Sequence, residues 1–298
     1  MSHFLYVCPL ALRIFLFLSC TLTWCIGRAQ PFFDVLNTSG QFYSNVYSDS
    51  IHTRGQTNTY TLSAGVPVEF KNGHTLIIKA NGERIHSEYR SGVVYRYDLY
   101  SISMPVGMQF KLNGNWKLLT MIIPKVASDM KGDPGKNGQL GGTALFTYIK
   151  NEKLKFKFGL YYNTECFGNF FVPLAGMDWK VNEHWFFYGT LPNNYRIEYR
   201  WSEKLFSGIG FRSFQRSYRL SEVYHHDYVR VKENELKLFT DCFISGKLLI
   251  FADLSYAFNY NLLEHPGEAE FAATLPVYTP LRPGFLFSAG LAYRIRKE

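Results

Sequence analysis

The sequence predicts an all-β protein: a single antiparallel, up-and-down transmembrane β-barrel of roughly 12 strands, within a range of about 10–14. Three observations lead to this fold class. Apolar and polar residues alternate with period two over long segments, tight-turn signals separate these segments, and 17% of the 298 residues are aromatic while only 19% are charged. This composition excludes an intrinsically disordered chain, a collagen, a coiled coil and a small disulfide-rich scaffold.

Residues 1–29 are predicted to be a cleaved signal peptide. The segment contains no acidic residue, and Arg13 precedes an apolar run, Ile14–Trp24, that has the length of a secretory h-region and is too short to span a bilayer. Gly27 and Ala29 supply small residues at the positions that signal peptidase reads. We therefore expect an exported protein whose mature chain begins at Gln30.

Two alternatives stay open for this segment: an uncleaved anchor, and a lipoprotein acylated at Cys25, although bulky Trp24 stands where a small residue is expected. Cleavage would leave Cys166 and Cys242, which are far apart and lack metal-ligand spacing. Two unpaired cysteines on strands are favoured over a disulfide, since nothing in the spacing demands pairing. The mildly basic chain has no Lys/Arg block, which argues against nucleic-acid binding.

The rest of the chain reads as a series of hairpins. Residues 30–55 are assigned to an N-terminal extension or a first strand, and residues 56–298 to the barrel. Every second residue between Tyr60 and Phe70 is apolar, and the turn dipeptide Asn72-Gly73 follows. The same alternation recurs over Tyr100–Phe110, Leu154–Leu160, Leu248–Tyr260 and Phe285–Arg296. Strands of this length can cross a membrane when they are tilted.

The connections are expected to differ at the two ends of the barrel, with short turns at one rim and long loops at the other. Tight turns are predicted at Asn113-Gly114, Asn151-Glu152, Asn182-Glu183, Ser202-Glu203 and Ser245-Gly246. Longer polar loops are predicted over Val126–Gly142, Glu165–Phe171, Leu220–Asp227 and Leu262–Pro283. The strand count is open at Phe42–Ser50, at Leu262–Pro283 and at the short segment Trp185–Leu191.

A soluble β-sandwich would also alternate and is the alternative fold. In a sandwich, one buried face would have to hold Lys155, Lys157, Arg196, Arg200 and Arg212. The opposite face is almost continuously apolar and would be a large exposed patch in water. A barrel accommodates both faces, because apolar residues contact lipid and polar residues face the lumen.

The most distinctive stretch lies between Leu174 and Phe214. It contains Met177-Asp178-Trp179, the turn Val181–Trp185, Leu191-Pro192, Arg196-Ile197-Glu198-Tyr199-Arg200 and Lys204-Leu205. This order resembles an uncharacterised family, a domain of unknown function, of predicted Gram-negative outer-membrane β-barrel proteins. Phe186–Thr190 stands where that family has leucine-rich sequence. The resemblance implies the fold and the location, and it implies no catalytic residues.

Motifs that could carry catalysis are weak. An outer-membrane phospholipase would need a paired His and Ser, and no such string occurs. His225-His226-Asp227 has no third metal ligand at a recognisable spacing and is interpreted as a loop. A rim protease that gathers Asp129, Asp133, His225 and Asp227 is kept as an alternative. We therefore predict a protein without catalytic residues, metal or cofactor.

The candidate functional residues form a basic patch on two neighbouring strands joined at Ser202-Glu203. Alternation points Arg196, Glu198 and Arg200 into the lumen from the first strand. The second strand adds Arg212 and Arg216 to the same inner surface.

This patch has two interpretations. Rings of arginine favour anions, so the patch could line a pore. Alternatively it belongs to an internal ion-pair network that closes the lumen, with Glu69, Glu235, Asp241 and Asp253 as partners. The network is favoured, because unpaired charge in a narrow interior is costly.

The sequence thus predicts a porin-like outer-membrane barrel protein that is either a small-solute channel, with anions as candidate solutes, or a structural membrane component. The alternative function is a barrel enzyme, a rim hydrolase or protease. Expected partners are outer-membrane lipid and small solutes or ions, and no nucleic acid. The solute, the oligomeric state and the openness of the lumen are left undetermined.

Overall fold

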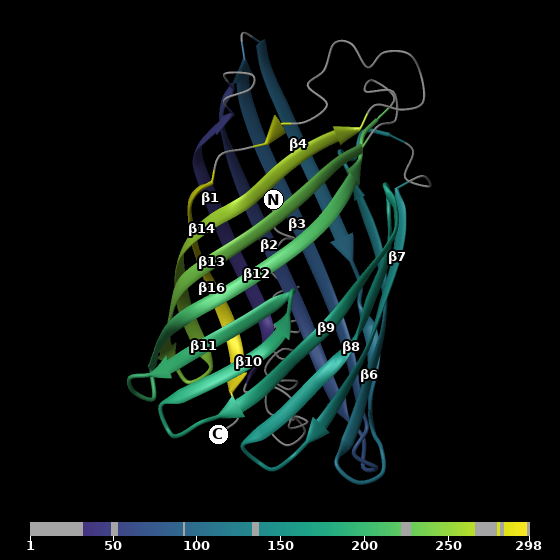
Figure 1. Ribbon diagram of the computed structural model, residues 1–298, viewed down its shortest axis with the longest axis vertical. Helices are drawn as coiled ribbons and strands as arrows, with labels where there is room; N and C mark the ends of the chain where they lie inside the picture. The colour runs from purple at the N-terminus through teal and green to yellow at the C-terminus, as the bar shows by residue number, and fades with distance from the viewer. Residues whose placement is uncertain are drawn as a thin grey trace, which may run out of the picture.

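The computed structural model describes residues 32–48, 53–91, 93–132, 137–221, 228–265, 279–280 and 283–296. Its strands form a closed antiparallel barrel of 14 strands plus one extra short strand (Figure 1). In chain order the elements are β1 (Phe32–Ser48), β2 (Thr53–Glu69), β3 (Thr75–Ser91), β4 (Val93–Ser103), β5 (Val106–Lys111), β6 (Trp116–Ser128), β7 (Gly138–Ile149), β8 (Leu154–Glu165), β9 (Gly168–Lys180), β10 (Trp185–Leu191), β11 (Asn194–Arg200), β12 (Leu205–Arg219), β13 (Tyr228–Ser245), β14 (Leu248–His265), β15 (Thr279–Pro280) and β16 (Gly284–Arg296). No helix in these residues is long and apolar enough to cross a membrane.

The ring closes between its first and last strands. β1 pairs antiparallel with β16 from Phe32↔Arg296 to Tyr43↔Leu286, and with β2 on its other side. Residues 32–48 are therefore a barrel strand, and the barrel begins well before residue 56. The 14 strands of the ring exceed the predicted figure of about 12 and stand at the upper limit of the predicted range of 10–14, because β1 and the short β10 are both strands of the ring.

β4 and β5 act as one interrupted strand, since both lie between β3 and β6. Met104-Pro105 separates them, and proline cannot donate a hydrogen bond to the ladder. The free backbone groups around the break are still used: the Pro105 carbonyl accepts from Lys79 N–H at 2.8 Å, and Met104 N–H donates to the Pro124 carbonyl at 3.0 Å. The apolar side chains that alternation assigns to one face stay on that face across the break: Ile102, Met104 and Val106 are all exposed.

The five predicted tight turns lie together at one end of the barrel, which is the lower end in Figure 1. Asn side chains shape several of them by accepting backbone hydrogen bonds, as turn-forming residues do. Asn151 Oδ1 accepts from Lys153 N–H and Leu154 N–H at 2.9 and 2.8 Å. Asn182 Oδ1 accepts in the same way from His184 N–H and Trp185 N–H at 2.9 and 2.8 Å.

The predicted long loop over Glu165–Phe171 is wrong. β8 continues to Glu165 and β9 begins at Gly168, so only Cys166 and Phe167 connect them. Gly168 has a φ of 113°, a conformation that glycine tolerates and side-chain-bearing residues rarely adopt. Polar residues such as Thr164 and Asn169 belong to the strands themselves, which is why the stretch read as a loop. The predicted loops at 222–227 and over most of 262–283 lie outside the described residues.

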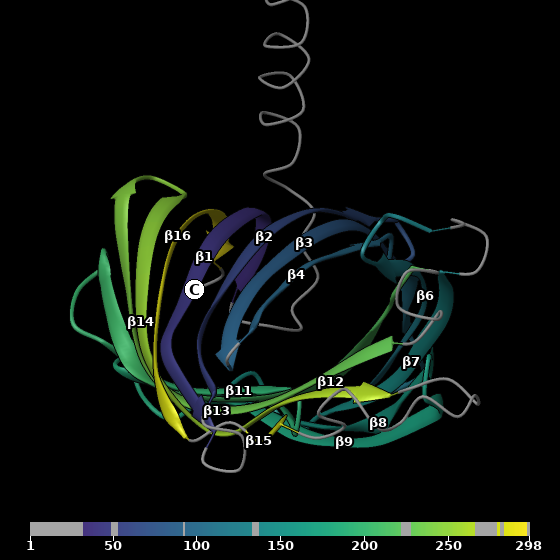
Figure 2. The same cartoon turned by 90° about the horizontal axis from the view of Figure 1, so that it is seen from above.

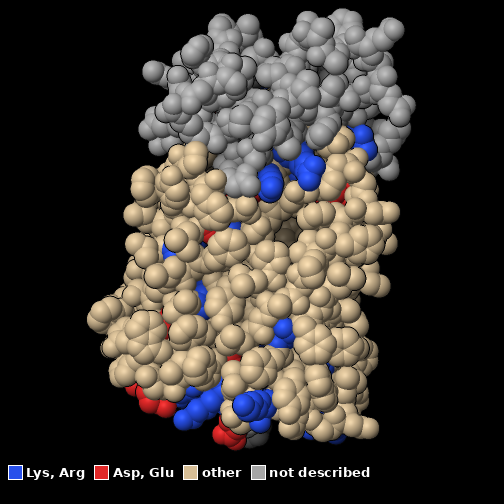
Figure 3. Space-filling model, in the orientation of Figure 1, with Lys and Arg blue, Asp and Glu red and all other residues tan. Residues whose placement is uncertain are grey.

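The exterior is apolar between its two ends. Side chains that alternate outward include Leu62, Phe158, Ile250 and Phe285, all more than 40% exposed. Figure 3 shows this face with few charges in its middle, a cluster of Lys, Arg, Asp and Glu at the rim of tight turns, and further Lys and Arg near the upper end.

Aromatic side chains gather on the outside near that rim. Trp185 and Trp201 contact Tyr199, with ring centroids 4.9 and 4.7 Å apart. Trp116 lies 4.9 Å from Tyr148 by the same measure. All three tryptophans are exposed.

At the opposite end the barrel folds inward. The last residues of β12 cross the interior, where Arg219 forms a parallel bridge with Ser128 of β6, a strand on another part of the wall (Figure 2). An apolar cluster fills the enclosed space, with Ile85, Leu99, Tyr218, Val229 and Val231 all 0% exposed. The lumen at this end is therefore a packed apolar core, where the sequence alone predicts a polar interior.

Candidate functional site

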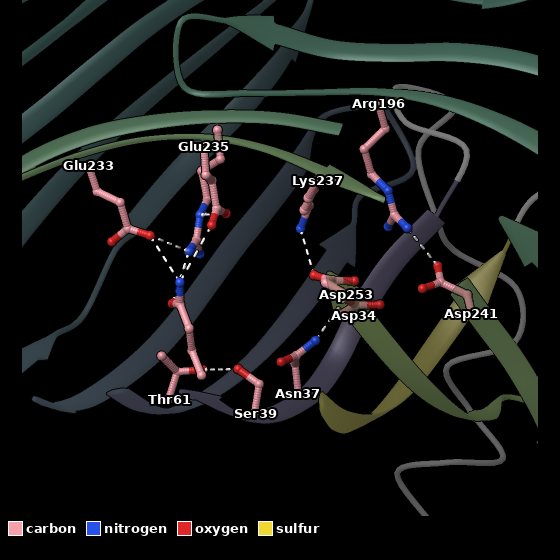
Figure 4. A network of polar contacts seen from close by, with 12 residues as sticks. Asp34, Asn37, Ser39, Thr61, Arg196, Glu233, Glu235, Lys237, Asp241 and Asp253 are labelled. Carbon is pink, nitrogen blue, oxygen red and sulfur yellow. Dashed lines mark hydrogen bonds and ion pairs between the residues drawn. The ribbon is translucent and has the colours of Figure 1, made fainter. Parts of the chain in front are cut away.

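The basic patch lies inside the barrel among carboxylates. Arg196 of β11 reaches across β12 to Asp241 of β13, with Nη2 3.0 Å from Oδ2. Arg294 of β16 reaches the same Oδ2 across β14 at 2.5 Å, and its Nε lies 2.6 Å from Asp34 Oδ1. Asp241 is thus shared by two arginines from opposite sides, and all three side chains are buried. Figure 4 shows the Arg196–Asp241 pair beside Asp34.

Glu198 occupies the next inward position of β11 and is fully buried. Its carboxylate accepts a hydrogen bond from Tyr188 Oη at 2.7 Å and pairs with Arg296. Arg296 belongs to β16, which is separated from β11 by three strands of the ring. This pair therefore ties two distant parts of the wall together across the lumen.

Arg212 of β12 is held by two acids on β13. Its Nη2 lies 3.2 Å from Glu233 Oε1, and its Nε lies 2.5 Å from Glu235 Oε1. Gln41 of β1 joins them, because it accepts from Arg212 at 3.1 Å and donates to Glu233 at 3.0 Å. Figure 4 shows the side chains of Glu233 and Glu235 pointing toward the same group of hydrogen bonds.

Arg216 lies nearer the inward-folded end. Its Nη1 is 2.5 Å from Glu83 Oε2 on β3, and the neighbouring Tyr218 hydroxyl donates to the same carboxylate. The guanidinium also lies over the Phe214 ring, 4.1 Å from its centroid, a cation–π arrangement. β3 and β12 are far apart in the ring, so this group again bridges the lumen.

Arg200 is the predicted patch residue closest to the tight turns. Its backbone N–H donates to the His184 carbonyl at 2.8 Å, and its guanidinium lies 6.0 Å from the centroid of the Phe206 ring. Of the four predicted acidic partners, Glu235 and Asp241 pair with patch arginines, whereas Asp253 pairs with Lys237 at 2.9 Å. Glu69 lies at the end of β2.

Sequence reasoning misses further members of this network. They are the acids Asp34, Glu83 and Glu233, the bases Arg294 and Arg296, and the pairs Lys157–Asp178 at 2.6 Å and Lys125–Glu165 at 3.1 Å. Alternation within the last strand could have identified Arg294, which shares the parity of the buried Leu286 and Ala292. Nothing in the sequence indicates which residue of a distant strand each of them meets.

The residues considered for catalysis are only partly described. Asp129 accepts hydrogen bonds from the backbone N–H groups of Lys131 and Ser221 at 3.1 and 3.0 Å, so it links the backbone at these two positions. Asp133, His225, His226 and Asp227 lie outside the described residues. In the part that is described, His, Cys, Asp and Glu form no group of three that could hold a metal ion.

Cys166 and Cys242, the cysteines of the described residues, are unpaired. Cys242 lies on β13 as expected, whereas Cys166 lies in the turn after β8 and not on a strand.

Comparison with known proteins gives one family match: the family described as "Domain of unknown function (DUF6268)" matches residues 27–294. Among curated proteins, none matches the sequence.

Several solved barrels are similar in shape. An outer membrane channel from Pseudomonas putida F1 has a TM-score of 0.49 and 10% identity, with 90% of this chain and 97% of that chain covered. The translocator domain of the autotransporter NalP from Neisseria meningitidis has a TM-score of 0.40 and 12% identity, with 96% and 95% covered. The NanC porin has a TM-score of 0.38 and 9% identity, with 87% and 100% covered. Each likeness concerns overall shape alone.

Proposed function

We propose that this chain, which belongs to the DUF6268 family, is an outer-membrane barrel with a closed lumen that serves as a structural component of the membrane. The observation that carries the proposal is the filling of the interior. Ion pairs such as Arg196–Asp241 and Arg212–Glu235 occupy the middle, and the core around Tyr218 and Val231 occupies the inward-folded end.

The exterior supports the membrane location. Outward side chains are apolar along most strands, and exposed tryptophans lie near the tight turns on the part of the wall from β6 to β11, as in the aromatic belts that meet a membrane interface. In water the same surface would be a very large apolar patch. The expected signal peptide, cleaved after Ala29, would deliver the chain to this location, and N-terminal sequencing of the membrane form would identify Gln30 as its first residue.

The proposal includes no catalytic step. Asp129, a member of the suggested rim protease, accepts hydrogen bonds from the backbone N–H groups of Lys131 and Ser221, which gives it a structural role.

A second candidate is slow passage of small solutes. It rests on Arg212, whose side chain remains 32% exposed toward the interior despite its two acidic partners. Arg196, Arg212 and Arg216 each lie beside an acid, so a route past Arg212 would show little preference for anions.

Planar-bilayer recordings test the proposal. The purified full chain should require detergent for extraction, shift on unheated gels, and give no steady current after insertion. A steady current would favour the pore, and a chain that stays soluble without detergent would contradict the membrane location. Arg212→Gln separates the two readings, because it should lower stability if the lumen is locked and change the conductance with little loss of stability if the lumen conducts.

A further inference from the structure

The wall of the barrel is incomplete between β9 and β12. The intervening hairpin, β10 and β11, is short, so β9 pairs with β10 only from Ala175 onward and β12 pairs with β11 only up to Arg212. Beyond the hairpin tip, residues 168–174 and 213–217 face one another, and none of the described strands lies between them. We call this opening the lateral window. It is bounded by these two segments and by the tip residues 191–194.

The upper corner of the window is held by side chains. Glu165 accepts from Ser217 N–H at 2.8 Å and from Ser217 Oγ at 2.6 Å, and Gln139 Nε2 donates to the Ser217 carbonyl at 3.0 Å. Cys166 N–H donates to Ser217 Oγ at 2.7 Å. At the lower corner, Ser213 N–H donates to the Asn193 carbonyl at 3.1 Å.

At the window edge formed by β9, the backbone groups before Ala175 pair with no strand among the described residues on that side. Lys180 N–H points to the β8 side, where it donates to the Lys153 carbonyl, and the β8–β9 register runs without a bulge. By alternation, Asn169 and Phe171 point their N–H groups into the window. Pro173 is the next residue whose N–H group would point into the window, but proline has no N–H group. Edge strands often carry proline for this reason.

The outer surface of β12 and β13 changes character beside the window. Below the hairpin tip it carries Ile209 and Leu238, both exposed and apolar. Above the tip the same face carries register-paired polar residues, Gln215 opposite Lys232 and Ser217 opposite Arg230. Gln215 Nε2 is buried there and makes no hydrogen bond within the described residues.

The window therefore joins an apolar outside to a basic inside. Phe171 and Leu191 border it on the outside, 59% and 46% exposed. Behind it, the Arg230 guanidinium lies 4.1 Å from the centroid of the Phe167 ring in the β8–β9 turn. Figure 3 shows a recess at this part of the wall, with Lys and Arg side chains along its upper border.

We propose that the lateral window binds a single-chain amphiphile with an anionic head group, such as a long-chain carboxylate. Its chain would lie against Phe171 and Leu191, and its head group would accept hydrogen bonds from Gln215, Arg230 and Lys232. The short edge, from Ser213 to Ser217, is about 13 Å long and both of its ends are occupied, which leaves room for one chain. This inference rests on the proposed membrane location, because the amphiphile would enter from the bilayer.

Photolabelling tests the site. The full chain is inserted into liposomes with tetradecanoate that carries a photoactivatable diazirine at its chain end, and labelled peptides are identified by mass spectrometry. Labels should concentrate in residues 168–174 and 191–195, against which the end of the chain would lie. Arg230→Gln combined with Lys232→Gln should reduce this labelling by about tenfold or more, because it removes two charge-assisted contacts.

Three controls make the result specific. Lys204→Gln removes a charge at the opposite rim and should leave the labelling unchanged, Arg230→Lys keeps the charge and should retain it, and the uncharged alcohol analogue should label weakly. If an inserted barrel were labelled equally on all outward strands, the proposed binding site would be wrong and the proposed function would stand. The same conclusion would follow if a two-chain anionic phospholipid labelled the window better than the single-chain probe. A chain that fails to insert would overturn the proposed function together with this inference.

Discussion

The carboxylate of Glu165, at the end of β8, accepts hydrogen bonds from both the backbone N–H and the hydroxyl of Ser217, at the upper end of the free edge of β12. In most of the barrel a strand edge is satisfied by the next strand. Here a side chain does so, and Lys125 Nζ, 3.1 Å from the same carboxylate, supports its charge. A strand edge held by side chains can be released by fewer broken bonds than one held by a continuous ladder.

Glu165→Ala should therefore free the edge of β12. We expect backbone amide exchange over residues 215–219 to accelerate about tenfold or more, because the Ser217 N–H loses a charged acceptor. Hydrogen exchange followed by mass spectrometry measures this. Glu165→Gln keeps an acceptor oxygen and should have a smaller effect. Equal exchange in all three proteins would show that Glu165 does not hold this edge.

Asp241→Asn should destabilise the barrel strongly. The substitution leaves Arg196 and Arg294 buried beside a neutral amide, and breaking a buried pair typically costs about 3–5 kcal/mol. Urea unfolding in liposomes, read from the shift of the folded band on unheated gels, gives the free energy. The control is Asp98→Asn, whose partner Arg84 is 51% exposed, and there the cost should stay below about 1 kcal/mol. A similar loss at both positions would argue against a special role of the lumen network.

Phe158→Arg places a charge on the apolar exterior. A cost of about 2–4 kcal/mol is expected if this position faces mid-membrane lipid, and the same holds for Ile250→Arg. The neighbouring Lys157 points inward to Asp178, so Lys157→Arg keeps the ion pair and should be mild. The measurement compares the free energies of unfolding of these variants and the unchanged protein in liposomes. If Lys157→Arg were the more damaging change, the assignment of inner and outer faces would be reversed.

Asn182→Ala should weaken the turn between β9 and β10. The side chain accepts two backbone hydrogen bonds there, each worth about 0.5–1.5 kcal/mol, so a loss of about 1–2 kcal/mol is expected. Asn182→Asp keeps the acceptor oxygen and serves as the matched control. Folding yield into detergent micelles and the unfolding midpoint report the effect, and an unchanged midpoint for Asn182→Ala would mean that the turn forms without this side chain.

Local signals in the sequence were sufficient for the repeating parts of the fold. Alternation assigns Phe158 to the exterior and Lys157 to the interior, and Asn-containing turns mark one rim, because strand periodicity and turn geometry depend on residues close in sequence. The same rule points Arg196, Glu198, Arg212 and Arg216 inward. The strand count was less accurate, since a seven-residue strand such as β10 falls short of a membrane-crossing length.

Only the tertiary structure decided what each inward residue meets. Val229 and Val231 alternate like any lipid-facing pair, yet they form part of an internal core, because the upper part of β12 and β13 folds into the barrel. Arg296 meets Glu198 from a strand nearly a hundred positions away, and no local pattern encodes that meeting. Periodicity fixes the two faces of a strand. What lies opposite each face depends on how the sheet closes, and here on the short β10–β11 hairpin that lets the wall open between β9 and β12.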